Sequence, residues 1–397
     1  MRALLQSILT ALARVYLARY RPMIIAVTGN VGKTSTKEII AAIVSKQKHT
    51  RMSGGNLNSE IGVPMTIIGD WSERYYNEGS NWGFWLEVIF GGIVFLIIPQ
   101  KYPEVLVLEY GADRPGDIDR LARQFKPHIG IVTAVGELPV HVEYFASANQ
   151  LAGEKSKLVQ ALGSDDFAVL NYDDQTVLDM KEKTKGKVVT FGMADGADVK
   201  ASNVDILIDQ DHKSEGISFK IQSNGNTMPF KIYGSLGDGL AKATAAGVAV
   251  GNILSINLVD MSEALSDYIA PPGRLHILKG IKDTIILDDT YNAAPAAMHL
   301  ALETLRDVPA LRRVAILGDM LELGVHSIPA HQGIGNLAAN IVDLLVCVGE
   351  KAKFIADSAG NQLNSNQILT FNTSQDVKYT IQKIIQEGDV ILVKGSQ

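Results

Sequence analysis

The sequence predicts an α/β fold: a P-loop central domain with a parallel sheet plus a small antiparallel appendage, followed by a Rossmann-like C-terminal domain. Three observations lead to this prediction. Short apolar runs alternate with helical patterns in both halves of the chain. A glycine-rich turn follows the first of these runs, and Pro271-Pro272-Gly273 separates the two halves.

The first 22 residues are predicted to form a basic amphipathic helix. They contain four arginines and no acid, and their apolar residues recur at helical spacing. A signal peptide is the competing interpretation, because Ala11-Leu12-Ala13 resembles a cleavage site. We reject it because the strand Met23–Thr28, which leads into the glycine-rich turn, begins at once, and the chemistry of such turns belongs inside the cell.

A second apolar stretch, residues 84–98, lies within an insertion at about 80–101. It is shorter than the ~20 residues that a membrane-spanning helix needs. Two interpretations stay open for this stretch and the N-terminal helix. They pack on each other or on the body of the protein, or they make peripheral contact with a membrane surface.

The central domain is expected over residues 23–270 and the C-terminal domain over 271–397. Val105–Glu109 and Ile129–Thr133 are predicted as further parallel strands of the central domain, whereas shorter, more polar strands after about residue 165 indicate the antiparallel appendage. The strands expected beyond the linker are Thr284–Leu287, Val314–Leu317, Leu344–Val348, Ile368–Phe371 and Val390–Val393. Ligands should bind at the carboxyl ends of these strands, facing the cleft between the domains.

Composition narrows the class of protein. Hydrophobic residues make up 46% of the chain, which is enough for each domain to bury a core. The net charge of −6 gives no reason to expect nucleic acid as a partner. Cys347 is the only cysteine, so the chain has no internal disulfide, which fits a reducing cytoplasm.

The glycine-rich turn is a shortened P-loop, residues 28–35 (TGNVGKTS), between a strand and a helix. Its N–H groups would face an anion, Lys33 would reach the outer phosphates, and the Thr34 hydroxyl would ligate Mg²⁺. The strict pattern requires glycine where this chain has Val27. Glu109 ends a neighbouring strand, where a P-loop needs a second metal-holding carboxylate.

Several segments in the same order resemble the Mur ligase family of cell-wall synthesis. They are TGNVGKTSTKE (28–38), GGNLNSEIGVPMT (54–66), VLEYGADRPGDI (107–118), HVEYFASANQLAGEKSKL (141–158), DDTYNAAPAAM (288–298), LGDMLELG (317–324) and VKGS (393–396). The resemblance covers roughly residues 23–396, and seven motifs in order make it specific.

The resemblance implies roles for individual residues. The catalytic residues would be Lys33, Glu109, His141 and Lys155. The Mg²⁺ ligands would be Thr34, Glu109, His141 and Lys155, with Lys155 carbamylated. ATP would contact Gly29, Asn30, Gly32, Lys33, Thr34, Ser35, Arg274, Asp289, Tyr291 and Asn292. The substrate would contact Asn56, Asn58, Asp319, Glu322, His331, Lys394 and Ser396.

Without the resemblance, three of these positions have simpler interpretations. His141 after Pro139 would be an ordinary loop histidine, and Lys155 would lie on a solvated helix face. One residue of the Asp288-Asp289 pair would cap the next helix.

The activity that the resemblance implies is ATP-dependent amide-bond formation. A carboxylate is activated as an acyl phosphate and is then attacked by an amine. The resemblance further implies that D-Ala-D-Ala is the amine and a muramoyl-peptide precursor is the carboxylate. Only about 22 residues precede the core, so we expect the uridine-gripping N-terminal domain of the family to be absent. We then expect either a lipid-linked or membrane-near acceptor, with peripheral contact at the inner membrane face, or a partner protein that supplies the missing recognition surface.

Two alternatives stay open. One is another amide ligase of the superfamily, of polyglutamate or cyanophycin type. The other is a catalytically degenerate nucleotide-binding interaction protein, suggested by the loss of the His-Asn pair that the family carries where this chain has Gly237-Asp238.

Overall fold

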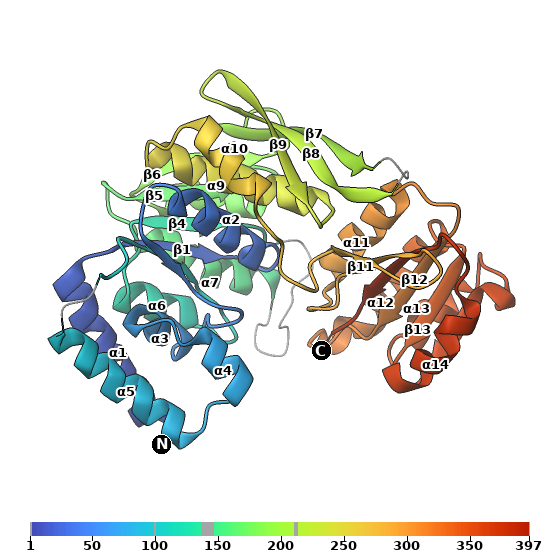
Figure 1. Cartoon of the computed structure of the whole chain (residues 1–397), viewed down its shortest axis with the longest axis horizontal. Coiled ribbons are helices and arrows are strands. Elements are labelled where there is room, and N and C mark those ends of the chain that lie inside the picture. The colour runs from blue at the N-terminus through green and yellow to red at the C-terminus, as the bar shows by residue number, and fades with distance from the viewer. Residues whose placement is uncertain (1, 99–100, 136–146, 210–212, 397) are drawn as a thin grey trace.

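The computed structural model describes residues 2–98, 101–135, 147–209 and 213–396. Within this described part the chain forms a nine-stranded sheet and a six-stranded sheet, which lie in two separate bodies (Figure 1). The strands of the first sheet are β1 (Met23–Thr28), β2 (Thr50–Met52), β3 (Val105–Glu109), β4 (Ile129–Val132), β5 (Phe167–Asn171), β6 (Lys187–Gly192), β7 (Val199–Ile208), β8 (Ser214–Ser223) and β9 (Asn226–Tyr233).

The first sheet has the order β2-β3-β1-β4-β5-β6-β7-β8-β9. Pairing is parallel from β2 to β7 and antiparallel from β7 to β9. The expected antiparallel appendage is therefore not a separate layer, because β7 hydrogen-bonds to β6 and continues the parallel sheet. β1 lies between β3 and β4, so the turn after β1 and the end of β3 meet at one edge of the sheet.

Helices cover both faces of this sheet. They are α1 (Arg2–Tyr20), α2 (Lys33–Ser45), α3 (Gly62–Ile68), α4 (Ser72–Glu78), α5 (Trp82–Ile97), α6 (Asp117–Gln124), α7 (Ala148–Gln160), α8 (Gln175–Leu178), the 3-10 turn η1 (Asp179–Lys183), α9 (Asp238–Ile253) and α10 (Leu258–Ser266). Side chains alternate across β1: Ile25 and Val27 pack with α2 and α9, whereas Ile24 and Ala26 pack in the cluster that contains α1, α3, α6 and α7. Burial on both faces explains why the strand is continuously apolar.

The second sheet contains β10 (His276–Lys279), β11 (Ile285–Asp288), β12 (Arg313–Gly318), β13 (Leu344–Val348), β14 (Ile368–Phe371) and β15 (Val390–Lys394). Its order is β10-β11-β15-β12-β13-β14, parallel except for β10. The remaining elements are α11 (Pro295–Asp307), η2 (Gly324–His326), α12 (Ser327–Ala339), α13 (Lys353–Ala359), η3 (Ser365–Gln367) and α14 (Ser374–Ile384). The antiparallel edge strand β10 was not predicted.

The N-terminal helix and the apolar insertion form a pair. α1 and α5 lie side by side at the side of the first body away from the second sheet (Figure 1). The Tyr16 hydroxyl donates to the carbonyl of Gly92 over 2.7 Å, so the interpretation that the two segments pack on each other is confirmed. In the described ranges, no helix combines the length and the hydropathy needed to cross a membrane.

Candidate active site

The phosphate loop occupies the predicted turn between β1 and α2. Gly29 has φ 147°, and a Cβ at this position would lie 2.0 Å from the Thr133 hydroxyl oxygen, so only glycine fits. The Thr133 hydroxyl donates to the carbonyl of Val31 over 2.7 Å and holds the loop. α2 begins after Gly32 without a capping side chain. Its first N–H groups are therefore available to an anion.

Glu109 lies at the end of β3, beside the loop, as the sequence predicts. Its carboxylate is 1% exposed and accepts hydrogen bonds from the Thr34 hydroxyl over 3.2 Å and the Asn58 amide over 3.0 Å. Thr34 and Glu109 thus present two oxygen atoms at one point, the kind of ligand that Mg²⁺ prefers. Among the described residues, no group of three histidine, cysteine, aspartate or glutamate side chains could hold a metal ion.

Lys37 is a charged residue of this cluster that the sequence analysis missed. It is fully buried, with its ammonium 3.9 Å from the Glu109 carboxylate and 3.3 Å from the carbonyl of Gly55. Burial lowers the pKa of Lys37, and the charge of Glu109 opposes this shift. Its position four residues after Lys33, on the same helix face, was the signal that could have revealed it.

Lys33 is half-buried at the start of α2. Its ammonium lies 3.3 Å from the carbonyl of Asn30 and bends back over the loop. Burial is the main cause that lowers the pKa of Lys33, and the charge of Glu109 opposes it. An anionic phosphate in the loop would favour the charged form of this lysine.

Lys155 does not lie on a solvated helix face. It is 2% exposed on the inner side of α7, and burial, with a smaller contribution from the charge of Lys33, lowers its pKa to about 7. Its neighbour Glu154 has a structural role, because that carboxylate accepts hydrogen bonds from the N–H groups of Gly116 and Ile118 at the start of α6. His141 lies outside the described residues.

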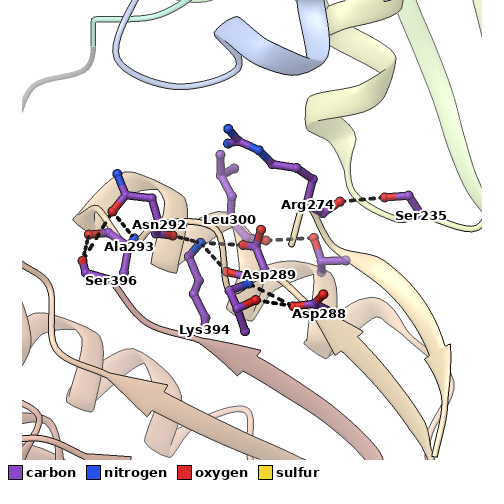
Figure 2. A network of polar contacts seen from close by, with 11 residues as sticks. Ser235, Arg274, Asp288, Asp289, Asn292, Ala293, Leu300, Lys394 and Ser396 are labelled. Carbon is purple, nitrogen blue, oxygen red and sulfur yellow. Dashed lines mark hydrogen bonds and ion pairs between the residues drawn. The ribbon is translucent and has the colours of Figure 1, made fainter. Parts of the chain in front are cut away.

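Arg274 joins the two bodies at the loop. Its guanidinium donates to the Thr34 hydroxyl over 3.0 Å and stacks on the Tyr291 ring, 3.9 Å from the ring centroid. Figure 2 shows this guanidinium pointing away from the polar network of the second body. Contact of Arg274 with the nucleotide phosphates stays a prediction, and the structure brings its guanidinium to the Thr34 hydroxyl at the phosphate loop.

The rest of the network in Figure 2 fixes the turn after β11. Lys394 pairs with the Asp289 carboxylate over 2.6 Å and donates to the carbonyl of Asn292 over 2.8 Å. The Ser396 hydroxyl lies 3.4 Å from the amide oxygen of Asn292. Asp288 accepts hydrogen bonds from the N–H of Gly273 and from Thr290.

The capping interpretation of the acidic pair is therefore wrong. The N-cap position of α11 is Ala294, which offers no side-chain acceptor, and Pro295 opens the helix. Asp288 instead ties the linker to the strand end, and Asp289 pairs with Lys394.

The residues expected to meet the substrate differ in access. Asn58 binds Glu109, and Asn56 is exposed, with its N–H donating to the Tyr76 oxygen over 2.6 Å. The Asp319 carboxylate accepts hydrogen bonds from the N–H groups of Lys351 and Ala352 and thus holds the start of α13.

His331 and Glu322 differ most in exposure to solvent. His331 is 0% exposed, and its ring bonds the carbonyl of Ser327 and the N–H of Met320. It therefore positions the 319–321 loop and does not present a nitrogen to the cleft, which corrects the expectation of direct substrate contact. Glu322 is exposed and has a left-handed φ of 61°.

A cavity of about 310 Å³ opens beside the loop, between the two bodies. Asn30 and Gly32 form its phosphate-loop end, and its walls combine apolar side chains with charged ones such as Arg274, Glu303 and Asp307. The principal apolar residues are Val204, Ile206, Ile217, Leu236, Leu275 and Leu300. A flat ring with polar edges and a phosphate tail suits this combination of apolar and polar walls beside the phosphate loop.

Comparison with known families matches both bodies. The Mur ligase middle domain matches residues 27–71 and 94–248, and the Mur ligase glutamate ligase domain matches residues 273–397. The middle domain alone covers half of the chain, so the chain belongs to the Mur ligase family. It is an enzyme, an ATP-dependent, ADP-forming ligase that joins an acid to an amine.

Particular relatives can be named. The UDP-N-acetylmuramoyl-tripeptide–D-alanyl-D-alanine ligase of Bacillus subtilis is 27% identical over 391 residues, which cover 98% of this chain and 76% of the relative. The ligase of the same name from Escherichia coli is 28% identical over 381 residues, covering 94% and 74%. The crystal structure of the MurF ligase from Thermotoga maritima in complex with ADP has a TM-score of 0.80 at 24% identity, covers 98% of this chain and 80% of that chain, and shares the fold.

Proposed function

We propose that this ligase joins D-alanyl-D-alanine to the terminal carboxylate of a muramoyl-peptide precursor of the cell wall, with ATP converted to ADP and phosphate. The relatives that it resembles over nearly its whole length carry this activity in their names. The observation that carries the proposal is the convergence of Thr34 and Glu109 from the first body with Arg274 from the second. Such a cleft encloses a phosphoryl-transfer site between two bodies.

The reaction begins with two anions that repel each other. A carboxylate oxygen attacks the γ-phosphorus of ATP, and the bond to the ADP oxygen breaks. Lys33, Lys37 and Arg274 bring three cationic groups to the place where this negative charge gathers. Groups placed in advance stabilise the transition state without reorganisation.

The second step forms the amide. The amine nitrogen of the dipeptide attacks the acyl carbon, phosphate leaves, and the nitrogen loses a proton. Water competes with this amine, so the cleft between the bodies must exclude it. The Arg274–Thr34 hydrogen bond holds the two bodies together at this point.

We assign Mg²⁺ to the oxygen pair of Thr34 and Glu109. The separation of 3.2 Å between the two oxygens supports a shared ligand position. When bound, the ion would neutralise phosphate charge. His141 and Lys155 remain proposed ligands of a second ion.

Carbamylation of Lys155 is part of this proposal. The reaction needs a neutral amine, which attacks CO₂ and releases a proton to give an anionic carbamate. A pKa lowered to about 7 supplies the neutral amine at cellular pH. The ammonium of Lys33 contributes to this shift, and the same charge would attract the carbamate.

We assign the adenine ring to the apolar cavity and the substrate to the loop residues named above. The apolar side chains in the wall of the cavity and its opening at Asn30 and Gly32 support this orientation of the nucleotide. Asn56, Asn58, Asp319, Glu322, Lys394 and Ser396 would then surround the acceptor and the dipeptide. The domain division at residue 271 and a cytoplasmic location belong to the same proposal, and contact with a membrane or a partner protein is proposed independently of the activity.

Product analysis tests the proposal. The protein is incubated with Mg-ATP and panels of carboxylates and amines, and ADP, phosphate and amide products are followed by mass spectrometry. Phosphate release that needs both D-Ala-D-Ala and a muramoyl tripeptide supports the proposal. Release with glutamate or cyanophycin-type substrates supports another amide ligase, and no turnover with any pair supports a degenerate binding protein.

Lys33→Ala should abolish turnover because it removes the cation at the phosphate loop. Lys46, exposed at the end of the same helix, provides the matched control as Lys46→Ala. Turnover that survives Lys33→Ala would remove the loop from the mechanism.

A further inference from the structure

The pair of α1 and α5 packs in parallel. Tyr16 bonds the carbonyl of Gly92, and one turn further along both helices the Arg19 guanidinium bonds the carbonyl of Leu96. Gly92 also lies against Leu12, since a Cβ on this glycine would be 2.8 Å from the Leu12 side chain. Figure 1 shows the pair at the outer end of the first body.

α5 exposes one continuous apolar row. The row consists of Trp82, Leu86, Phe90, Ile93 and Ile97, exposed by 57%, 61%, 71%, 45% and 74%. Spacings of three and four residues place these side chains along one face of the helix. The opposite face is buried through Phe84, Trp85 and Val88, so this helix is apolar on both sides.

α1 exposes a matching row. Leu4, Ile8 and Val15 are exposed by 66%, 39% and 52%, and the exposed Ala11 and Ala18 continue the same spacing. We call the two rows together the outer apolar face.

The two rows lie on the same side of the helix pair. On α1, Ala11 and Val15 come one residue before Leu12 and Tyr16, which contact α5. On α5, Ile93 and Ile97 come one residue after Gly92 and Leu96, which contact α1. One residue turns a helix by about 100°. The α1 row is therefore rotated from the contact between the helices in one direction, and the α5 row in the other. Because the two helices are parallel and face each other, both rows lie on the same side of the pair.

The charge around this face is positive in an acidic protein. Arg2, Arg14, Arg19 and Arg21 are exposed and residues 2–22 contain no acid, although the whole chain has a net charge of −6. The one acid of α5, Glu87, shares the guanidinium of Arg74 with Glu78 of α4, so the positive charge lies on the α1 side of the face. Arg19 places a positive charge at the carboxyl end of the α5 row.

We propose that the outer apolar face binds the surface of an anionic lipid bilayer, with α1 and α5 lying in the plane of the interface. Arginines beside large apolar side chains are the composition of interfacial helices. α5, with 16 residues, is about 24 Å long at ~1.5 Å per residue, shorter than the ~30 Å hydrocarbon core. The match to the Mur ligase middle domain is interrupted between residues 71 and 94, where α4 and most of α5 lie.

A second copy of this chain is the competing occupant of the face. Exposed arginines on both copies would face each other in such a pair, whereas they complement anionic headgroups. α1 and α5 lie on the side of the first body away from the second sheet (Figure 1), whereas the Arg274–Thr34 contact lies between the two bodies. Binding to lipid therefore leaves the cleft open and does not depend on the proposed ligase activity.

Vesicle binding tests the proposal with the full chain. The protein is sedimented with vesicles of phosphatidylcholine alone or mixed with phosphatidylglycerol, at low and high salt. We expect binding to the mixed vesicles only, weakened by salt, with a blue shift of the tryptophan fluorescence, to which the exposed Trp82 contributes. Phe90→Ser/Ile97→Ser should lower the partition coefficient at least about tenfold, and Arg14→Gln/Arg21→Gln should weaken binding in the same direction.

Matched controls separate this surface from general effects. Leu311→Ser/Val325→Ser removes side chains of the second body that are exposed by 95% and 89%, and Lys181→Gln/Lys183→Gln removes exposed charges elsewhere; both should bind as the parent does. Circular dichroism checks folding, and Leu86→Ser provides a second apolar variant.

Three outcomes overturn the proposal. The first is no binding to the mixed vesicles, and the second is that Phe90→Ser/Ile97→Ser and Leu86→Ser both bind as strongly as the parent. The third is a lipid-free dimer, seen by light scattering, that Phe90→Ser/Ile97→Ser dissociates. ADP release with soluble substrates should be unchanged in these variants. This readout distinguishes failure of lipid binding from failure of the ligase proposal.

Discussion

Glu109→Gln tests the centre of the site most directly. The substitution keeps the shape of the side chain and its acceptor oxygen, and removes the charge that faces Lys37 over 3.9 Å. Because Lys37 is fully buried, its ammonium would then lack a counter-charge. We expect turnover to be lost, since the carboxylate proposed to hold Mg²⁺ is gone.

The effect on stability can be estimated. Removing one partner of a buried ion pair costs about 3 kcal/mol at the lower end of measured values. A domain of this size loses about 2–4 °C in Tm for each kcal/mol, so the first body should melt about 6–12 °C lower. Differential scanning calorimetry without nucleotide at neutral pH measures this shift.

The pH dependence of the deficit follows from the direction of the Lys37 pKa. In Glu109→Gln the pKa of Lys37 in the folded state falls further below that of the unfolded chain, because burial lowers it and the opposing charge of Glu109 is gone. The unfolded lysine binds a proton below about pH 10.4. Stability of the variant is therefore lost as the pH falls below this value, and the deficit should shrink as the pH is raised towards it.

A double variant separates stability from catalysis. Glu109→Gln/Lys37→Met removes the buried charge as well, so it should recover most of the lost Tm and none of the turnover. The reasoning is refuted if Glu109→Gln melts like the parent, or if Lys37→Met recovers no stability in a folded double variant. Turnover that survives Glu109→Gln would separately remove this carboxylate from the mechanism.

Three further outcomes are expected. Arg274→Ala should raise the KM for ATP about 10–100-fold, the range for losing one hydrogen bond to a charged group, with Arg274→Lys intermediate in steady-state assays. Ala297→Phe should fill the cavity beside the loop and weaken ATP binding in calorimetry, whereas Ala296→Phe on the exposed side of α11 should not. Since the Lys155 pKa is about 7, turnover should fall as the pH drops through 7 and the ammonium forms, and bicarbonate should increase turnover above that pH. A carbamate signal from ¹³C-bicarbonate that is lost in Lys155→Gln and kept in Lys157→Gln would check this assignment.

The sequence by itself determined the elements that depend on short-range patterns. The apolar runs Leu344–Val348 and Ile368–Phe371 are short and bounded by polar residues, so β13 and β14 were predicted with the bounds that the structure gives them. The phosphate loop was equally determined, because Gly29 and Gly32 adopt backbone conformations that other residues rarely reach. Glu109 followed from its place at the end of a buried strand.

Tertiary structure decided which charged residues are buried and which helix faces stay exposed. The residues next to Lys155 and Lys37 in the sequence are typical of a solvated helix face. Only packing shows that both lysines are buried and that Lys37 pairs with Glu109. The exposed row on α5 could not be predicted from the sequence either, because a helix that is apolar on all sides does not reveal which side packs on the protein. Burial depends on contacts between segments distant in sequence, and hydrophobic spacing within one segment carries no information about them.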